Sequence, residues 1–239
     1  MTALGIIPAR YQSTRLPGKP LKDILGKTMI RRVYEQAQQS HLDKVIVATD
    51  DKRIVDEVLS FDGEVMMTSK HHISGTDRCL EVLHSQKEKY DAVVNIQGDE
   101  PFIEPQQINQ LIAVFGDKEI QIATLAKRIE REEALTNESK PKVRFNADGR
   151  ALSFDRVLNA NFKEDVFFKH IGIYAYQPHI LEEVCKLPPS PLEIEHKLEQ
   201  WRWLENGYKL NVLETAFDSY AVDTAEDLKK IIERFGDSC

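Results

Sequence analysis

Residues 3–8 read Ala-Leu-Gly-Ile-Ile-Pro, a short apolar run that a proline closes and a basic loop follows. An apolar run of this length is typical of a strand that is buried on both faces. Three similar runs occupy residues 45–49, 65–67 and 92–96, and segments with apolar residues at helical spacing separate them. This alternation predicts an α/β fold with an open, mostly parallel sheet of the nucleotide-binding type, flanked by helices.

After about residue 120, strands are expected without full crossover helices between them, which indicates a smaller mixed or antiparallel region. The turn residues 146–149 predict a hairpin, and the charged run 127–133 favours a solvated face or a loop. The expected strands are 122–126, 142–145, 151–154 and 170–176, and the expected helices are 192–204 and 224–235. We expect one domain over 1–239, with a nucleotide-binding half over 1–120, the smaller part over about 121–220, and a C-terminal helix over 221–239 that returns to the main sheet.

The composition excludes several classes of protein. The chain has 239 residues, 41% of them apolar and 30% charged, which suits one globular unit with a large core. Its 32 basic and 39 acidic residues give a net charge of −7, which disfavours a nucleic-acid partner. No stretch approaches the roughly 18 apolar residues that span a bilayer, and the N-terminus carries no pattern of an export signal.

The three cysteines, Cys79, Cys185 and Cys239, are odd in number and far apart. Their spacing matches neither a zinc site nor a redox motif, so we expect thiols in a reducing, cytoplasmic environment. Cys79 and Cys185 are expected to act as small buried hydrophobic side chains, with a nucleophile as the alternative.

Parallel sheets bind ligands outside the carboxyl ends of their strands, near the point where the strand order reverses. The loop Pro8–Leu21, PARYQSTRLPGKPL, begins at such an end and carries Arg10, Arg15 and Lys19. Forked guanidinium groups and a mobile ammonium suit the oxygens of a triphosphate. Because Lys19 precedes a proline rather than Ser or Thr, this is not a Walker A loop. A basic surface loop is the alternative.

A second candidate follows the fourth strand, where residues 97–101 read Gln-Gly-Asp-Glu-Pro. Asp99 can bind a hard cation through oxygen, and Gly98 lets a substrate approach the backbone. Glu100 is expected to support the turn. The alternative for Asp99 is a cap on the helix that begins near Pro105.

A further carboxylate, Asp223, lies in the sequence Val-Asp-Thr and is a second metal candidate. Thr224 and Asp227 have the spacing of a capping box, so the segment also reads as a simple helix start. On facing strand ends, Asp99 and Asp223 are able to hold Mg²⁺ together.

Residues 74–78, Ser-Gly-Thr-Asp-Arg, also predict a helix start, because Ser74 and Asp77 form a capping box. A helix N-terminus is in addition a place where anions bind, and Arg78 is able to reach a ligand from it.

These segments together resemble the sugar cytidylyltransferases, and most closely those that act on 3-deoxy-D-manno-octulosonate (KDO). The resemblance covers nearly the whole chain and rests on PARYQSTRLPGKPL, SGTDR, QGDEP, HIGIY, SPLE, LEQWRWLENGY and VDT. It implies a GT-A-like nucleotidyltransferase fold and transfer of a cytidylyl group from CTP to KDO, with release of diphosphate. It further implies Mg²⁺ as cofactor, a cytoplasmic homodimer, a role in lipopolysaccharide biosynthesis, and sugar binding and dimerisation by the smaller part.

The resemblance also assigns residues. It implies catalytic roles for Arg10, Lys19 and Asp99, and Mg²⁺ ligation by Asp99 and Asp223. The implied nucleotide contacts are Pro8, Ala9, Arg10, Ser13, Arg15, Lys19, Ser74, Gly75, Arg78, Gln97 and Asp99, with Gln97 at the cytosine. The implied sugar contacts are Arg156, His170, Tyr174, Glu199 and Gln200.

For three of the implied sugar contacts, the sequence also supports a purely structural role. His170 also reads as a satisfied histidine within a strand, Glu199 as an exposed helix charge, and Tyr174 as a core residue. Asp155 replaces a serine that is usual in the family, and it is placed to pair with Arg156 and weaken the attraction of that side chain for a sugar carboxylate.

Three other activities stay open on the sequence. A CMP-sialic acid synthetase shares the chemistry and much of the first loop. A nucleotide-sugar glycosyltransferase uses an Asp-x-Asp pair, which residues 98–100 do not supply. A non-catalytic CTP-binding regulator would retain the pocket alone.

Overall fold

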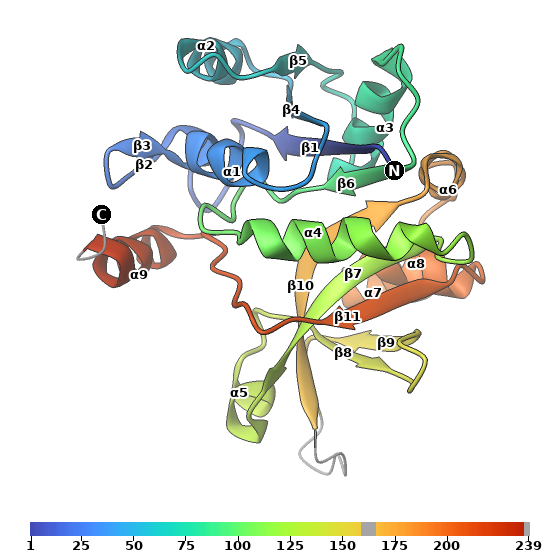
Figure 1. Cartoon of the computed structure of the whole chain (residues 1–239). Coiled ribbons are helices and arrows are strands. Elements are labelled where there is room, and N and C mark those ends of the chain that lie inside the picture. Colours follow the sequence, from blue (N-terminus) through green and yellow to red (C-terminus); the bar gives the residue numbers. More distant parts are fainter. Residues whose placement is uncertain (159–165, 237–239) are drawn as a thin grey trace. The chain divides into compact units, whose positions relative to one another are not determined.

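A computed structural model gives the structure of this chain, and it describes residues 1–158 and 166–236. The chain forms two compact units (Figure 1). The first contains residues 1–109 and 219–239, and the second contains residues 110–218.

The first unit is built on the four strands that the apolar runs predict. They are β1 (Ala3–Ala9), β4 (Lys44–Thr49), β5 (Val65–Met67) and β6 (Ala92–Asn95). All pair in parallel, in the order β6-β1-β4-β5. β1, β4 and β6 are almost wholly buried, as a sheet covered on both faces requires. The predicted parallel sheet is confirmed.

Three amphipathic helices connect these strands: α1 (Met29–Gln38), α2 (Lys52–Ser60) and α3 (Gly75–Ser85). From β1 through β4 to β5 the strand order advances in one direction, and α3 then leads back past β1 to β6. Because crossover connections are right-handed, α3 covers the face opposite α1 and α2. The strand order therefore reverses at β1, and the carboxyl ends of β1 and β6 are the expected place for a ligand.

The C-terminal segment completes the first unit. The helix α9 (Ala225–Phe235) packs on a small apolar cluster that includes Leu16, Ile24 and Met29. Next to this cluster are the short 3-10 helix η1 (Lys19–Leu21) and the two-residue strands β2 (Asp23–Ile24) and β3 (Lys27–Thr28). This packing holds the base of the loop after β1.

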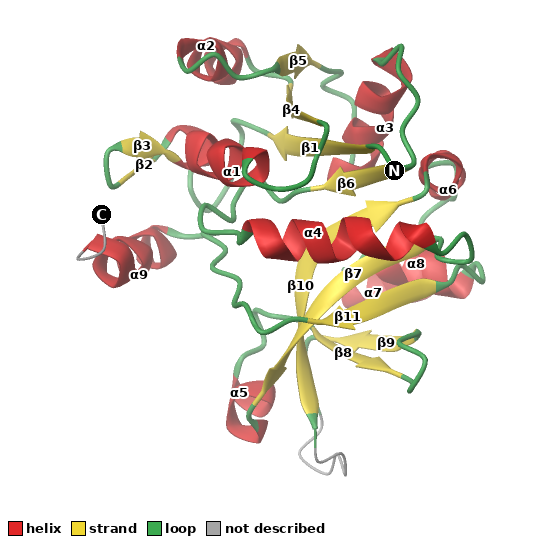
Figure 2. Ribbon diagram, viewed as in Figure 1, coloured by secondary structure: helices red, strands yellow, loops and turns green. Residues whose placement is uncertain are grey.

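The second unit carries a mixed sheet (Figure 2). Its central strand β7 (Ile122–Ile129) pairs in parallel with β11 (Leu210–Glu214) and antiparallel with β10 (Phe167–Tyr176). A hairpin of β8 (Lys142–Phe145) and β9 (Ala151–Asp155) joins β10 at Lys169 and Lys142. The predicted hairpin is confirmed, whereas β11 was not predicted.

The other helices that the structure describes span nine residues or fewer. They are α4 (Pro105–Ala113), within which the boundary between the units falls, η2 (Val114–Gly116), α5 (Arg131–Thr136), α6 (Pro178–Val184), α7 (Pro191–His196) and α8 (Gln200–Glu205).

One local prediction was wrong. The expected helix 192–204 is divided into α7 and α8, because Lys197 adopts a left-handed conformation with φ of 54°. The run 127–133 forms a solvated face rather than a loop: β7 continues to Ile129, α5 begins at Arg131, and residues 128 and 130–132 are exposed.

Cys79 is fully buried on α3, as predicted, while Cys185 is only half-buried and Cys239 lies outside the described residues. None of the helices within the described ranges is long and apolar enough to cross a bilayer.

Candidate nucleotide site

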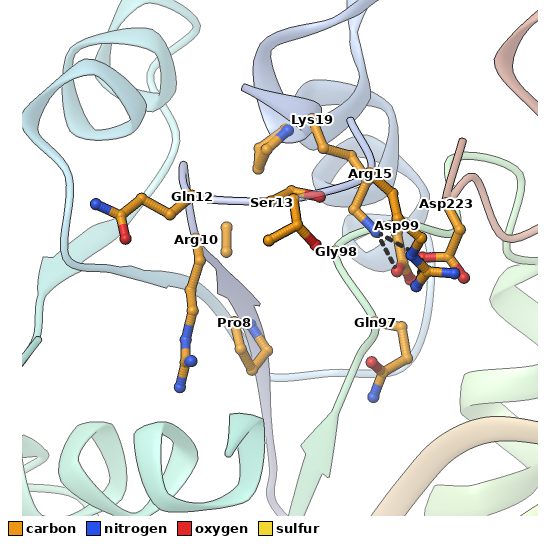
Figure 3. Close-up of a pocket in the computed structure, with 13 residues that line it drawn as sticks. Pro8, Arg10, Gln12, Ser13, Arg15, Lys19, Gln97, Gly98, Asp99 and Asp223 are labelled. Atoms are coloured by element: carbon orange, nitrogen blue, oxygen red, sulfur yellow. Dashed lines mark hydrogen bonds and ion pairs between the residues drawn. The ribbon is translucent and has the colours of Figure 1, made fainter. Parts of the chain in front are cut away.

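A pocket with a volume of about 340 Å³ lies at the carboxyl ends of β1 and β6, where the strand order reverses (Figure 3). Its lining combines the end of β1, the loop that follows, the turn after β6 and one residue from the segment before α9. The lining residues are Pro8, Ala9, Arg10, Gln12, Ser13, Thr14, Arg15, Lys19, Pro20, Gln97, Gly98, Asp99 and Asp223. Most of the lining therefore follows the carboxyl ends of two parallel strands, as the fold predicts.

The loop after β1 is closed by its own backbone. The amide of Gly18 donates to the carbonyl of Tyr11 at 3.1 Å. Gly18 has a positive φ of 66°, and a Cβ there would lie 3.1 Å from the Tyr11 ring. The guanidinium carbon of Arg53 lies 3.3 Å from the centroid of that ring, a cation–π contact that holds Tyr11 from α2. The sharp turn at Gly18 allows the chain to enter η1 at Lys19.

Gly98 allows the ends of β1 and β6 to approach each other. A Cβ at this position would lie 2.7 Å from the carbonyl oxygen of Pro8, which is closer than a side chain tolerates. The sequence suggested that this glycine admits a substrate to the backbone. In the structure, the close neighbour is the protein's own backbone.

A backbone hydrogen bond holds Asp223 next to Asp99. The amide of Val222 donates to the carbonyl of Asp99 at 2.9 Å. Ser219 adds a side-chain bond, because its hydroxyl donates to the buried carboxylate of Glu100 at 2.5 Å. Glu100 thus supports the turn, as expected.

The start of α9 is capped without the carboxylate of Asp223. Thr224 and Asp227 form the predicted capping box, with the Asp227 amide donating to the Thr224 hydroxyl at 3.1 Å. The amide of Asp223 also donates to Asp227. Helix capping therefore falls to Thr224 and Asp227, and the carboxylate of Asp223 faces the pocket.

Lys19 connects the two acids. Its Nζ lies 2.7 Å from Asp99 Oδ2 and 3.1 Å from Asp223 Oδ1. Arg15 Nη2 approaches the same oxygen of Asp223 at 3.0 Å. Burial alone lowers the pKa of Lys19, but the ion pairs and hydrogen bonds with Asp99 and Asp223 outweigh it and raise that pKa. Lys19 is therefore a fully charged ammonium held between two carboxylates at neutral pH.

Arg10 points away from this acidic pair (Figure 3). Its Nη2 donates to the backbone carbonyl of His72. Burial and the neighbouring Arg78 lower the pKa of Arg10, and Asp50 and Asp77 partly offset this effect. Arg10 and Lys19, which the resemblance pairs in catalysis, thus line one pocket but contact different partners.

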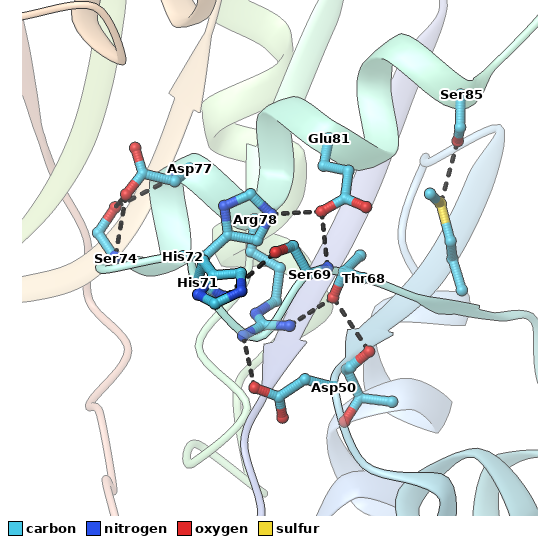
Figure 4. A network of polar contacts seen from close by, with 12 residues as sticks. Asp50, Thr68, Ser69, His71, His72, Ser74, Asp77, Arg78, Glu81 and Ser85 are labelled. Atoms are coloured by element: carbon cyan, nitrogen blue, oxygen red, sulfur yellow. Dashed lines mark hydrogen bonds and ion pairs between the residues drawn. The ribbon is translucent and has the colours of Figure 1, made fainter.

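Arg78 lies in a polar network below the start of α3 (Figure 4). Its side chain is fully buried and donates to the Thr68 hydroxyl and, at 3.0 Å, to Asp50. We expected Arg78 to reach a ligand from the helix start, but in this structure its guanidinium connects α3 to the ends of β4 and β5. The predicted capping box of Ser74 and Asp77 is confirmed.

The pocket thus contains only part of the predicted nucleotide set. Eight of those residues line it, whereas Ser74, Gly75 and Arg78 do not. Three lining residues carry no predicted role: Gln12, Thr14 and Pro20. All three belong to the quoted loop, so the strand-end rule already pointed to them.

The sugar candidates lie in the second unit, and two of them occupy an aromatic core. His170 Nε2 lies 3.0 Å from the Thr124 hydroxyl, and its ring contacts Phe154 edge-on. Tyr174 packs edge-on against Trp203. Burial lowers the pKa of His170 to about 3, with a small contribution from a nearby lysine, so the imidazole is neutral. Burial also raises the pKa of Tyr174 well above its usual value.

The other three sugar candidates differ in burial and in their contacts. Gln200 is buried on α8, and Glu199 immediately before it is half-buried. Arg156 donates to the carbonyls of Ser139 and Lys197 at 3.3 and 3.5 Å.

Asp155 does not pair with Arg156, contrary to our expectation. It accepts from the Ser153 hydroxyl at 2.9 Å and lies 4.0 Å from the guanidinium of Arg144. Successive residues point to opposite faces of strand β9, so Asp155 joins Ser153 on one face and Arg156 is left to other partners.

This chain is similar in sequence to known cytidylyltransferases. A family model described as "Cytidylyltransferase" matches residues 4–215. The 3-deoxy-manno-octulosonate cytidylyltransferase of Parabacteroides distasonis is 49% identical over 245 residues, covering 97% of each chain. That of Bacteroides thetaiotaomicron is 50% identical over 242 residues, covering 96% of each chain.

Solved structures add the fold. A CMP:2-keto-3-deoxy-manno-octonic acid synthetase complexed with CTP is 40% identical, covers all of both chains and superposes with a TM-score of 0.93. A nucleotidyl transferase from Methanothermobacter thermautotrophicus, at 14% identity and a TM-score of 0.66, shares the fold alone. The chain therefore belongs to the cytidylyltransferase family, among the relatives of its 3-deoxy-manno-octulosonate cytidylyltransferases.

Proposed function

We propose that this chain transfers the cytidylyl group of CTP to KDO, forming CMP-KDO and diphosphate. The observation that carries the proposal is the pocket after β1 and β6, in which Lys19 and Arg15 meet Asp99 and Asp223. Relatives at 42–50% identity are named 3-deoxy-manno-octulosonate cytidylyltransferases, which supports this sugar over sialic acid.

The triphosphate is proposed to lie along the loop after β1. Arg15 is largely exposed and Lys19 is anchored at the pocket wall, so both are able to exchange carboxylate oxygens for phosphate oxygens. Arg10 is proposed to join them by exchanging the His72 carbonyl for a phosphate oxygen. Gln97, at the other end of the pocket lining, is proposed to contact the cytosine.

Asp99 and Asp223 are proposed to hold Mg²⁺. Both present an oxygen to the same ammonium nitrogen, so they are close enough to share one cation. No cluster of three or more His, Cys, Asp or Glu side chains suited to a metal occurs within residues 1–158 and 166–236. Magnesium bound by two carboxylates normally takes its remaining ligands from water and phosphate, which fits this pair. When bound, the ion neutralises charge that develops on the phosphate oxygens.

The proposed reaction is an in-line displacement at the α-phosphorus. A bond forms between the anomeric oxygen of the sugar and the α-phosphorus, and the bond to the β-phosphate oxygen breaks. Diphosphate leaves with the electron pair, and the hydroxyl proton passes to water. Lys19 and Arg15 hold the phosphates in position and stabilise the charge of the leaving group, which is the main task of a protein in phosphoryl transfer.

The second unit is proposed to recognise the sugar. Arg156 carries a positive charge for a sugar carboxylate, and Gln200 and Glu199 offer hydrogen-bonding groups. His170 and Tyr174 are proposed to support this surface from the core, because both are buried among aromatic rings. A homodimer, a cytoplasmic location and a role in lipopolysaccharide biosynthesis stay predictions from the resemblance.

The test is diphosphate release measured with a panel of acid sugars and the four nucleoside triphosphates. We expect release with CTP and KDO, and at least about tenfold slower release with sialic acid or with another nucleotide. Absence of release with CTP and KDO would overturn the proposal. Equal release with sialic acid would overturn the assigned sugar but leave the nucleotide assignment intact.

A further inference from the structure

One ammonium nitrogen connects three segments of the first unit that are far apart in the sequence. Lys19 begins η1, Asp99 belongs to the turn after β6, and Asp223 precedes α9. The Nζ of Lys19 lies 2.7 Å from the first carboxylate and 3.1 Å from the second. The side chain of Lys19 is only 16% exposed, against 64% for Arg15, so Lys19 is the inner of the two cations.

Two carboxylates that share a site repel each other unless a cation lies between them. The backbone bond from Val222 to Asp99 and the bond from Ser219 to Glu100 hold these segments together independently of Lys19. The fold therefore places the two carboxylates together, and a cation between them offsets their repulsion.

We propose that Lys19 is a placeholder cation: in the nucleotide-free protein it occupies the position that a divalent cation takes between Asp99 and Asp223. The ammonium and the divalent cation then compete for the same two carboxylates. Phosphate oxygens of an incoming triphosphate offer Lys19 new partners and release it from the acids. This inference rests on the proposed function, because it assumes a divalent cation at Asp99 and Asp223 and a triphosphate at the loop.

A consequence for the order of binding follows. Before CTP arrives, Lys19 must leave its two ion pairs for a divalent cation to enter, so cation binding to the nucleotide-free protein is weak. After CTP arrives, that cost is removed. Nucleotide and cation therefore strengthen each other's binding, by the same factor in both directions.

The test uses Mn²⁺ as the probe and the full chain without CTP. Binding is measured by the electron paramagnetic resonance signal of free Mn²⁺, for the wild type and for Lys19→Gln. We expect Lys19→Gln to bind Mn²⁺ about tenfold more tightly, because the competing ammonium is gone while the carboxylates remain. Equal or weaker Mn²⁺ binding by Lys19→Gln would overturn the proposal.

Two matched variants separate competition from general charge effects and from misfolding. Lys22→Gln removes the same charge three residues along, and among the described residues Lys22 is not an ion-pair partner of Asp99 or Asp223. It is expected to bind Mn²⁺ less than about twofold more tightly than the wild type. Lys19→Arg retains a cation and is expected to stay close to the wild type. A tenfold gain in either variant would contradict competition at this site.

The result is independent of turnover. If the wild type releases diphosphate from CTP and KDO but Lys19→Gln gains no Mn²⁺ affinity, the proposed function stands and the placeholder fails. If no diphosphate is released but the gain in affinity is observed, the placeholder stands and the proposed function fails.

Discussion

In the first unit most of the candidate side chains line one pocket, where Lys19 forms ion pairs with Asp99 and Asp223. In the second unit two of the candidates, His170 and Tyr174, lie instead in an aromatic core. His170 is neutral and contacts Phe154 and Thr124. Motif residues that line the pocket, such as Lys19, are candidates for chemistry. Motif residues that are buried among aromatic rings, such as His170, support the fold around a site.

The largest effect is expected for Asp99→Ala, which tests whether the pocket of the first unit carries the chemistry. We expect diphosphate release to fall about 100-fold or more, because a proposed metal ligand is lost, while CTP affinity falls much less. Turnover and nucleotide binding are measured separately. Asp56→Ala removes an exposed carboxylate on α2 and should leave both unchanged. Full turnover by Asp99→Ala would remove the acidic pair from the mechanism.

The next prediction concerns the approach of the two strand ends. Gly98→Ala places a Cβ against the carbonyl of Pro8 and should lower the free energy of unfolding by about 1–3 kcal/mol. Gly116→Ala is the matched control, since in the part of the chain that the structure describes no atom beyond its chain neighbours and its own helix lies within 4 Å of the added Cβ. Denaturant unfolding measures both. If the two variants are equally stable, the close contact at Pro8 does not constrain this turn.

His170 tests the second unit through the pH dependence of the free energy of unfolding. Its folded pKa of about 3 is below the unfolded value of about 6.5, so the unfolded state binds more protons between these values. Stability from a neutral His170 is complete above pH 6.5 and should fall by up to about 1.4 kcal/mol per pH unit below it.

His170→Gln should flatten that slope, and His179→Gln, at an exposed position on α6, should not. Unfolding free energies at several pH values between about 7 and 4 give the slopes. An unchanged slope in His170→Gln would mean that the imidazole is protonated within the fold.

The smallest expected effect is that of Ser74→Ala. The hydroxyl accepts the Asp77 amide at 3.0 Å, so its loss should cost about 1 kcal/mol of stability. CTP affinity should change less than about threefold, since Ser74 does not line the pocket. Unchanged stability together with a large loss of CTP affinity would show that Ser74 contacts the nucleotide.

The sequence predicted the parallel sheet because its strands are continuous apolar runs, and it placed the pocket because strand order decides where the carboxyl ends meet. It did not predict β11, because apolar and polar residues are mixed in that short strand. It also did not predict the break between α7 and α8, because a lysine, rather than the more usual glycine, adopts the left-handed conformation there. Local sequence carries no information on such tertiary choices.

The same limit applies to the site. The motif at residues 74–78 does not reveal that Arg78 is buried, because its partners Asp50 and Thr68 follow the ends of β4 and β5. The partner of Asp155 was also wrongly predicted, since it depends on the pairing of β8 with β9. Local motifs identified the reactive residue types, and the three-dimensional contacts decided which of them face a ligand.

The most direct measurement is a crystal structure of this chain with CTP bound. We expect the triphosphate to lie against Arg15 and Lys19, with the Lys19 nitrogen withdrawn from Asp99 and Asp223 toward the phosphate oxygens. A triphosphate bound elsewhere, with Lys19 still between the two carboxylates, would contradict both the site and the role assigned to it.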